Sequence, residues 1–275
     1  MSDQPTDLGL AFIDSCDSIT LMMIHGFPFS SAMWEPQIED LASVTRVIAP
    51  DLRGHGRSQA VPGSYTMEML ADDCVGLLDY LAITTPVVVC GLSMGGYVAF
   101  EFFRRYPELV AGLILTSTRA LPDTPQGKAN RDKMAAKAQT EGVAAIAADM
   151  LPKLFSPKTY EENEEVVDFV QEMMEWASVD GVVGALAAMR DRPDSSPTLT
   201  EIDVPTLIIH GADDKIVPLA EAEAMRDAIP NAQLVVIPDA GHVPNLEQID
   251  AFNDAVMDFL MELQDAYVHD HNHHH

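Results

Sequence analysis

The chain has 275 residues, of which 47% are hydrophobic, so it can bury a large core and is too apolar to be disordered. Its 43 acidic and 16 basic side chains give a net charge of −27, which argues against nucleic acid and anionic membrane surfaces as partners. No apolar run approaches the roughly 20 residues of a membrane-spanning helix.

The cysteines and the two ends of the chain carry few signals. Cys16, Cys74 and Cys90 are odd in number and lack the spacing of a metal site, which is typical of a reduced, cytoplasmic protein. The first residues contain no basic segment, so we expect no secretory signal. The tail 269–275 holds five histidines, is typical of a tag remnant or a low-complexity end, and is left out of the fold. We predict neither a metal nor a cofactor, and the sequence leaves the oligomeric state open.

Strands and helices alternate in the first 119 residues and again after residue 199. Alternation at this spacing predicts a mostly parallel sheet with helices on both faces. The predicted strands are 8–13, 19–24, 44–49, 87–90, 110–115, 204–210 and 233–237, and the predicted helices are 31–41, 65–81, 97–103, 219–229 and 246–263.

Residues 120–198 interrupt this alternation with helical stretches and no convincing strand. Prolines mark several of their ends. We therefore predict an α/β core built from residues 1–119 and 199–268, with an inserted all-helical cap at 120–198. The cap helices are predicted at 127–139, 143–151, 161–177 and 182–189.

A glycine-flanked serine lies between a buried strand and an apolar helix, in the sequence Gly91-Leu92-Ser93-Met94-Gly95. A strand that turns into a helix within a few residues leaves the central residue in strained backbone geometry. The same turn exposes the serine hydroxyl at the positive end of the helix. Ser93 is therefore the candidate nucleophile.

A serine hydroxyl needs a base, and the base needs a group that orients it. His242 follows one predicted strand, and Asp213 and Asp214 follow another. Carboxyl ends of parallel strands converge on one crevice, so these distant residues can meet Ser93 there. The order Ser, Asp, His is the one found in hydrolases whose nucleophile lies on a strand-to-helix elbow. The spacing alone leaves open which aspartate acts.

Two backbone N–H groups are candidates for binding the oxyanion that forms during acyl transfer. The elbow supplies the N–H of Met94, and the loop 25–28 after an early strand supplies that of Phe27. The glycine-rich and charged loop 51–58 is expected to brace its neighbours. His55 in that loop is not expected to act as the base.

Together these motifs resemble the α/β-hydrolase superfamily over residues 8 to 265. Within it the chain is most similar to small bacterial carboxylesterases and enol-lactonase-like hydrolases with a helical cap. The resemblance implies the α/β-hydrolase fold, a Ser-His-Asp triad and a small-molecule ester substrate. In such proteins the acid stands three residues after a glycine and four before a proline, which implies Asp214. The motifs are Gly91–Gly96, the loops 25–28 and 51–58, the segment 211–218, and Gly241-His242.

The first functional hypothesis is carboxylic ester hydrolysis through an acyl-enzyme on Ser93. The same triad could instead serve an enol-lactone, a carbon–carbon bond, or peroxide as acyl acceptor in a cofactor-free perhydrolase or haloperoxidase. The last of these is supported by a resemblance to cofactor-free haloperoxidases and perhydrolases of this fold, in which a proline often follows the aromatic residue of this loop, as Pro28 follows Phe27. Such a proline restricts the loop. A binding protein on a hydrolase scaffold is the remaining alternative, and the intact triad argues against it. Candidate substrate-binding residues are Pro28, Leu121, Trp176, Val217 and Val243.

The net charge of the chain also predicts which class of substrate is preferred. The long-range field of a chain at −27 predicts that neutral esters are preferred over carboxylate-bearing lactones. A local cationic pocket that includes Arg119 or Arg190 would outweigh that field. The acidity itself is compatible with a very soluble surface or with adaptation to salt.

Overall fold

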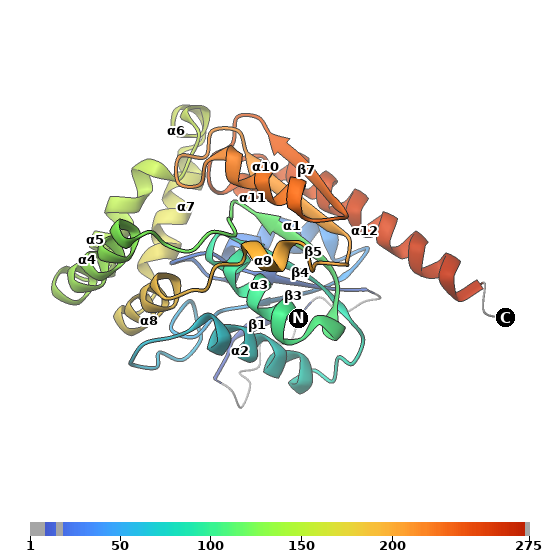
Figure 1. Cartoon of the computed structure of the whole chain (residues 1–275). Coiled ribbons are helices and arrows are strands. Elements are labelled where there is room, and N and C mark those ends of the chain that lie inside the picture. Colours follow the sequence, from blue (N-terminus) through green and yellow to red (C-terminus); the bar gives the residue numbers. More distant parts are fainter. Residues whose placement is uncertain (1–8, 15–18, 273–275) are drawn as a thin grey trace.

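Within residues 9–14 and 19–272, which the computed structural model describes, seven strands form one central sheet (Figure 1). Their order is β1-β3-β2-β4-β5-β6-β7, and every neighbouring pair is parallel except β1 with β3. The predicted, mostly parallel sheet is confirmed. The strands are β1 Phe12–Asp14, β2 Thr20–Ile24, β3 Arg46–Pro50, β4 Val87–Leu92, β5 Val110–Thr116, β6 Thr206–Gly211 and β7 Ala232–Ile237.

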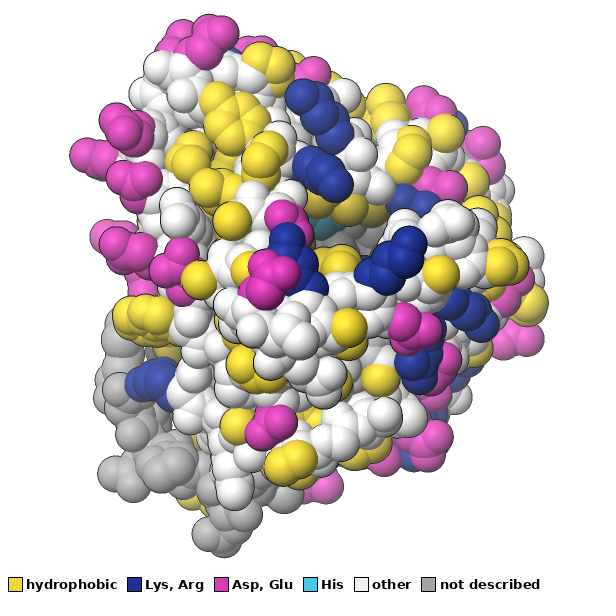
Figure 2. Space-filling model, turned by 90° about the vertical axis from the view of Figure 1, so that its left-hand side faces the viewer, with side chains coloured by type: hydrophobic (Ala, Val, Ile, Leu, Met, Phe, Trp, Pro, Cys, Tyr) yellow, Lys and Arg dark blue, Asp and Glu magenta, His cyan; other side chains and the backbone are white. Residues whose placement is uncertain are grey.

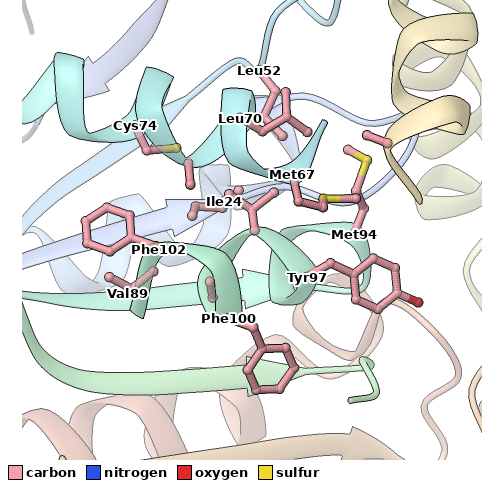
Figure 3. Close-up of a cluster of buried hydrophobic side chains, with 14 of the residues drawn as sticks. Ile24, Leu52, Met67, Leu70, Cys74, Val89, Met94, Tyr97, Phe100 and Phe102 are labelled. Carbon is pink, nitrogen blue, oxygen red and sulfur yellow. The ribbon is translucent and has the colours of Figure 1, made fainter. Parts of the chain in front are cut away.

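Helices cover both faces of the sheet, because successive side chains of a strand point to opposite faces. In β4, Val87 and Val89 pack with α2 and α3 (Figure 3), whereas Val88 and Cys90 pack with α1 and α12. Burial raises the pKa of the Cys90 thiol, as expected for a core cysteine. The helices of the core are α1 Glu35–Leu41, α2 Met67–Tyr80, α3 Met94–Arg105, α10 Leu219–Ala228, α11 Pro244–Glu247 and α12 Ile249–Asn272, with 3-10 turns η1 Ser31–Trp34 and η2 Pro107–Leu109.

The last helix is longer than predicted. α12 continues past the predicted end at residue 263 to Asn272, so its backbone extends into the His-rich tail. Figure 1 shows this end of α12 projecting from the rest of the molecule. No helix in the described part of the chain combines the length and the apolar character needed to cross a membrane.

Between β5 and β6, where every residue is described, the chain forms helices and no strand. We call residues 120–198 the cap segment. The sequence predicts one helix over 161–177, but the structure has two, α6 and α7, because Asn163 ends the first and its side chain caps the second by accepting the Val166 N–H at 3.3 Å. The helices are α4 Pro125–Glu141, α5 Val143–Met150, η3 Leu151–Lys153, α6 Pro157–Glu162, α7 Glu164–Glu175, α8 Val179–Arg190 and α9 Ser196–Leu199.

The cap segment lies directly against the core along α8. A Cβ atom on Gly181 would lie 2.1 Å from the carbonyl oxygen of Gly54, so only glycine fits at this contact. The same oxygen accepts the N–H and the hydroxyl of Ser178, at 3.1 and 2.9 Å. Further along α8, Gly184 packs on the ring of Tyr65. These contacts hold α8 at a fixed place on the core.

Two loops lie at the carboxyl ends of the neighbouring strands β2 and β3. The β2 loop is residues 25–28, and the β3 loop is residues 51–58. Asp51 accepts the N–H of Ser31 at 2.7 Å and that of Arg57 at 3.1 Å. Its carboxylate thereby holds the β3 loop against η1. These contacts agree with the bracing role expected for the β3 loop.

A pair of buried histidines connects the two loops. Nδ1 of His25 lies 2.8 Å from the Gly26 carbonyl oxygen, and Nε2 accepts the Leu52 N–H at 2.9 Å, so the ring is neutral with its proton on Nδ1. The ring of His55 lies 5.3 Å from it, with Nδ1 3.0 Å from the Arg53 carbonyl oxygen. Burial lowers the pKa of His25 to about 4; burial and the neighbouring His25 lower the pKa of His55 to about 3.

The turn from β4 into α3 is packed against backbone on two sides. A Cβ on Gly91 would lie 2.1 Å from the Gly95 carbonyl oxygen, and a Cβ on Gly95 would lie 2.1 Å from the carbonyl oxygen of Ile24. A side chain at position 95 would push the turn away from β2, and one at position 91 would clash with the backbone of the turn itself. Glycine is therefore required at both positions by close approach.

Replacing Gly95 with alanine should destabilise the fold. The added Cβ must displace the end of β2, and we expect the free energy of unfolding to fall by about 2 kcal/mol or more. Urea denaturation measures this change. Gly127→Ala, in the first turn of α4 with its nearest neighbour at 3.4 Å, is the matched control and should change stability by less than about 0.5 kcal/mol. Equal stability of the two variants would contradict the close approach.

The buried histidines should make the protein sensitive to mild acid. Below the ordinary histidine pKa of about 6.5, the unfolded chain binds protons that His25 and His55 in the folded chain do not bind. Stability should therefore fall with pH from about 6.5 towards 4, by up to about 1.4 kcal/mol per pH unit for each histidine. Urea denaturation at pH 7.5 and 5.0 should give a smaller loss for His55→Gln than for the wild type. The same loss in both proteins would show that His55 does not titrate in this way.

Candidate active site

Ser93 lies at the tip of the turn between β4 and α3, in left-handed backbone geometry. Its φ is 54° and its ψ is −110°, which a non-glycine residue rarely adopts. Three contacts hold this conformation: its N–H donates to the Thr116 carbonyl oxygen at 2.9 Å, and its own carbonyl oxygen accepts the Gly96 N–H at 2.9 Å and the Thr118 hydroxyl at 2.8 Å. The neighbouring strand β5 thus fixes the strained residue.

The structure brings Asp214, and not Asp213, to His242. Nδ1 of His242 lies 2.9 Å from Oδ2 of Asp214, whose Oδ1 accepts the N–H groups of Ile216 and Val217 at 2.8 and 2.9 Å. Asp213 is exposed, one residue earlier in the same turn. Burial acts to raise the pKa of Asp214, but the charge and hydrogen bond of His242 and the Val217 N–H together lower it below its ordinary value. Asp214 is therefore a carboxylate.

A second histidine supports the same turn. His210, at the end of β6, is buried, and its Nε2 lies 2.8 Å from the Val217 carbonyl oxygen and 3.6 Å from Oδ2 of Asp214. Burial lowers its pKa. The contacts of His210 hold the turn that carries Asp214. His210 does not line the pocket described below, so it does not contact a molecule bound there.

A buried carboxylate fixes the loop that carries His242. Oε2 of Glu247 accepts the N–H of Gly241 at 2.8 Å and that of Val243 at 3.3 Å, on either side of the histidine. Oε1 accepts the N–H of Ser156 at 2.7 Å and the hydroxyl of Thr159 at 2.9 Å, both in the cap segment. Burial raises the pKa of Glu247, against the effect of these hydrogen bonds.

Two backbone donors near Ser93 are unused. Within the described residues, neither the N–H of Phe27 nor that of Met94 has a hydrogen-bond partner. Met94 is the first residue of α3, whose initial N–H groups have no acceptor in the helix itself. Phe27 lies in the β2 loop, which the Phe29 N–H closes by donating to Gly26 at 2.9 Å. Both remain candidates for binding an oxyanion.

One pocket of about 170 Å³ contains Ser93 and His242 together. Core and cap segment both contribute to its wall, so the cap segment lies over the carboxyl ends of the strands. The lining residues are Phe27, Ser93, Tyr97, Arg119, Asp123, Arg131, Met150, Met189, Arg192, Ile216, Val217 and His242.

Of the five residues predicted to bind substrate, only Val217 lines this pocket. Trp176, at the end of α7, is 69% exposed, and Leu121 is 47% exposed, so both point towards solvent instead. Pro28 and Val243 are buried beside the site without lining it. The peptide bond between Phe27 and Pro28 is cis.

Several lining residues carry no motif in the sequence. Asp123, Arg131 and Arg192 come from the cap segment, and Tyr97 is the third residue after the methionine that opens α3. No signal in the sequence separates the first three from the many other charged residues of the cap segment. Within the described residues, no group of three or more His, Cys, Asp or Glu side chains is arranged to hold a metal ion.

Comparisons with known proteins identify the family of the chain. The chain is similar to a thermophilic esterase from Thermogutta terrifontis solved with malate bound, with 44% identity, a TM-score of 0.91, and coverage of 92% of this chain and 93% of the other. It is 29% identical to 3-oxoadipate enol-lactonase 2 of Acinetobacter baylyi over 93% of this chain and 94% of that protein. It is 32% identical to 2-hydroxymuconate semialdehyde hydrolase of a Pseudomonas species over 93% and 91%. The family model for the alpha/beta hydrolase fold matches residues 19–248. The chain therefore belongs to the alpha/beta hydrolase fold family.

Proposed function

We propose that the protein hydrolyses carboxylic esters of small molecules through an acyl-enzyme on Ser93. One observation carries this proposal: Ser93 and His242 line the same pocket, and Asp214 holds the other side of the histidine ring at 2.9 Å. A serine, a histidine and a carboxylate in these relations are the requirements of nucleophilic acyl transfer. The similarity to a thermophilic esterase supports the same chemistry.

In this mechanism His242 acts as the general base. Its Nδ1 donates to Asp214, which leaves Nε2 as the atom that takes the hydroxyl proton of Ser93. The serine oxygen then attacks the ester carbonyl carbon, and the imidazolium gives its proton to the leaving alcohol. Asp214 is a carboxylate with a lowered pKa, so it stabilises the positive ring while keeping its own charge.

The unused N–H groups of Phe27 and Met94 bind the carbonyl oxygen as it becomes negative. Neither donor has to give up a partner within the described residues, so no existing hydrogen bond is broken when the oxyanion forms. In the second half of the reaction, His242 takes a proton from a water molecule as this water attacks the acyl-enzyme. The bond between the acyl carbon and the Ser93 oxygen then breaks, the imidazolium returns its proton to that oxygen, and the acid is released.

We also propose separate roles for the core and the cap segment. Residues 1–119 and 199–268 form the core that carries the triad, and the cap segment, 120–198, shapes the substrate pocket. Its residues in the pocket wall, Met150 and Met189 among them, support this division.

An enol-lactone is the second candidate substrate. A lactone is an internal ester, so the same steps open its ring without a separate leaving group. The similarity to 3-oxoadipate enol-lactonase 2 favours this alternative. Comparing kcat/KM over a panel of open-chain esters, lactones and diketones separates the two candidates, because the preferred class has the highest value.

Replacing Ser93 with alanine should abolish ester hydrolysis without unfolding the protein. Loss of the nucleophile typically lowers kcat by several orders of magnitude. Release of p-nitrophenol from p-nitrophenyl acetate measures the rate, and circular dichroism verifies the fold. Activity above about 1% of wild type in pure, folded protein would exclude Ser93 as the nucleophile.

The two neighbouring aspartates provide a matched pair of variants. Asp214→Asn keeps the shape of the side chain but favours the wrong tautomer of His242, and we expect kcat to fall about 10³- to 10⁴-fold. Asp213→Asn, at an exposed position in the same turn, should change kcat less than about threefold. The assignment of the acid fails if Asp213→Asn is the more damaging variant.

A further inference from the structure

The candidate pocket is rich in arginine, although the whole chain has a net charge of −27. Arg119, Arg131 and Arg192 line it, together with the single carboxylate of Asp123. Figure 2 shows Lys and Arg side chains bordering the hollow on this face of the molecule. Three cations and one anion leave a net positive charge among the residues that line the pocket.

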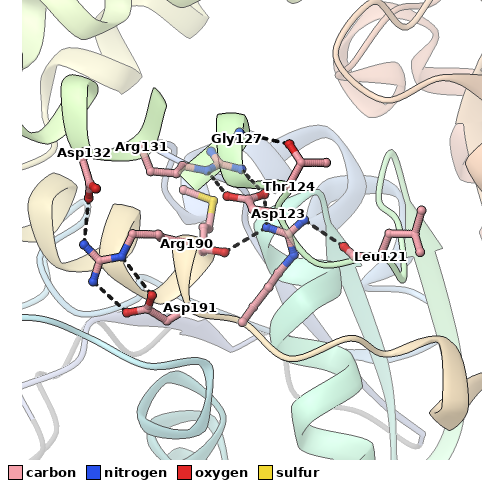
Figure 4. Close-up of polar contacts among 10 residues, drawn as sticks. Leu121, Asp123, Thr124, Gly127, Arg131, Asp132, Arg190 and Asp191 are labelled. Carbon is pink, nitrogen blue, oxygen red and sulfur yellow. Dashed lines mark hydrogen bonds and ion pairs between the residues drawn. The ribbon is translucent and has the colours of Figure 1, made fainter. Parts of the chain in front are cut away.

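Two of these arginines are paired with the same carboxylate (Figure 4). Nε of Arg131 lies 2.9 Å from Oδ2 of Asp123, and Nη1 of Arg192 bonds the other oxygen. Arg192 also donates to the carbonyl oxygens of Met189 and Leu121, at 2.9 Å each. These contacts fix both guanidinium groups in the pocket wall and hold the pKa of Asp123 below its ordinary value against the effect of burial.

Arg119 differs from the other two arginines in its contacts. Among the described residues it makes no ion pair, and its one hydrogen bond runs from Nη2 to the Ile216 carbonyl oxygen at 3.0 Å. The N–H of Ile216 donates to Asp214, and Thr118, next to Arg119 in the chain, donates to Ser93. The Arg119 side chain therefore begins next to a residue that contacts the nucleophile and ends on the turn that carries the acid. Most of its five N–H donors have no partner among the described residues.

We infer that Arg119 binds a carboxylate in the acyl part of the substrate, so that half-esters of short dicarboxylic acids are preferred substrates. The inference rests on the proposed ester hydrolysis at Ser93. A guanidinium pairs with a carboxylate through two charge-assisted hydrogen bonds, and Arg119 has the donors for them. Both residues line one pocket of about 170 Å³, so we expect the acyl carbonyl at Ser93 and the carboxylate at Arg119 to share this pocket, which favours an acyl chain of a few carbons.

The negative charge of the whole chain does not cancel this contact. Charges on the outer surface act across solvent, where salt screens them beyond roughly 8 Å at physiological ionic strength. A carboxylate at Arg119 is bound at hydrogen-bond distance and partly removed from solvent. Arg190, the other arginine considered from the sequence, instead pairs with Asp132 and Asp191 and does not line the pocket (Figure 4).

Two esters of equal chain length test the inference: mono-p-nitrophenyl glutarate, which is anionic, and p-nitrophenyl valerate, which is neutral. We assay wild type, Arg119→Met and the control Arg190→Met at 0.15 and 0.5 M NaCl, with spontaneous hydrolysis subtracted. We expect Arg119→Met to lower kcat/KM for the glutarate ester about 10- to 100-fold more than for the valerate ester. Arg190→Met should leave the ratio unchanged. Equal losses on both esters would mean that Arg119 only supports the Asp214 turn, and would overturn the inference.

Binding to Ser93→Ala protein tests the same contact without turnover. Calorimetry compares the monoamide of glutaric acid, which is anionic, with neutral valeramide. The monoamide should bind more tightly, and Arg119→Met in the Ser93→Ala background should remove its advantage. Equal affinity of the two amides overturns the inference. If the wild type hydrolyses neither ester, the proposed function fails, and the calorimetric comparison still decides whether the anion site exists.

Discussion

The close packing of the β4–α3 turn against the end of β2 is the contact on which the rest of the site depends. Gly95 lies so near the carbonyl oxygen of Ile24 that no side chain fits between them. The residues that follow Ile24 form the β2 loop, so the same contact brings Phe27 beside the turn. Ser93 occupies its left-handed conformation at this point, held by β5 on the other side. The two candidate oxyanion donors and the nucleophile are thus positioned by backbone packing, which the Thr118 hydroxyl and the His25 ring support.

Those parts of the site that depend on backbone geometry were predictable from sequence. Ser93, Asp214 and His242 each lie in a short motif whose glycines or prolines also constrain the local chain, so residue type and position are encoded together. The apolar runs predicted the central strands β2, β4, β5 and β6, because strands buried on both faces need them. Boundaries were less accurate. An asparagine can lie inside a helix or cap its N-terminus. Only the structure, in which Asn163 lies between α6 and α7, shows that it is a cap here.

The pocket wall could not be predicted in the same way. Helical spacing tells which side chains of one cap helix share a face, but not which face turns to the core when several helices pack together. Trp176 has the residue type expected of a pocket wall, yet it lies on the outer face of its helix. Arg131 and Arg192 lie on the inner side, where Asp123 offsets the cost of burying their charges. Asp123 is 69 positions from Arg192 and 8 from Arg131, so the compensation leaves no pattern of charges one helical turn apart.

The cap segment is tied to the core at two points, and these contacts limit how the pocket can change. Near its middle, the carbonyl oxygen of Leu154 accepts the N–H of His242 at 2.8 Å, and Glu247 binds Ser156 with the same carboxylate that holds the histidine loop. Near its end, α8 lies against Gly54 through a contact that admits only glycine. Moving the cap segment at the first point would cost hydrogen bonds on the loop that positions His242. The pocket is therefore largely preformed, and selectivity among substrates depends on the side chains that line it more than on opening of the cap segment.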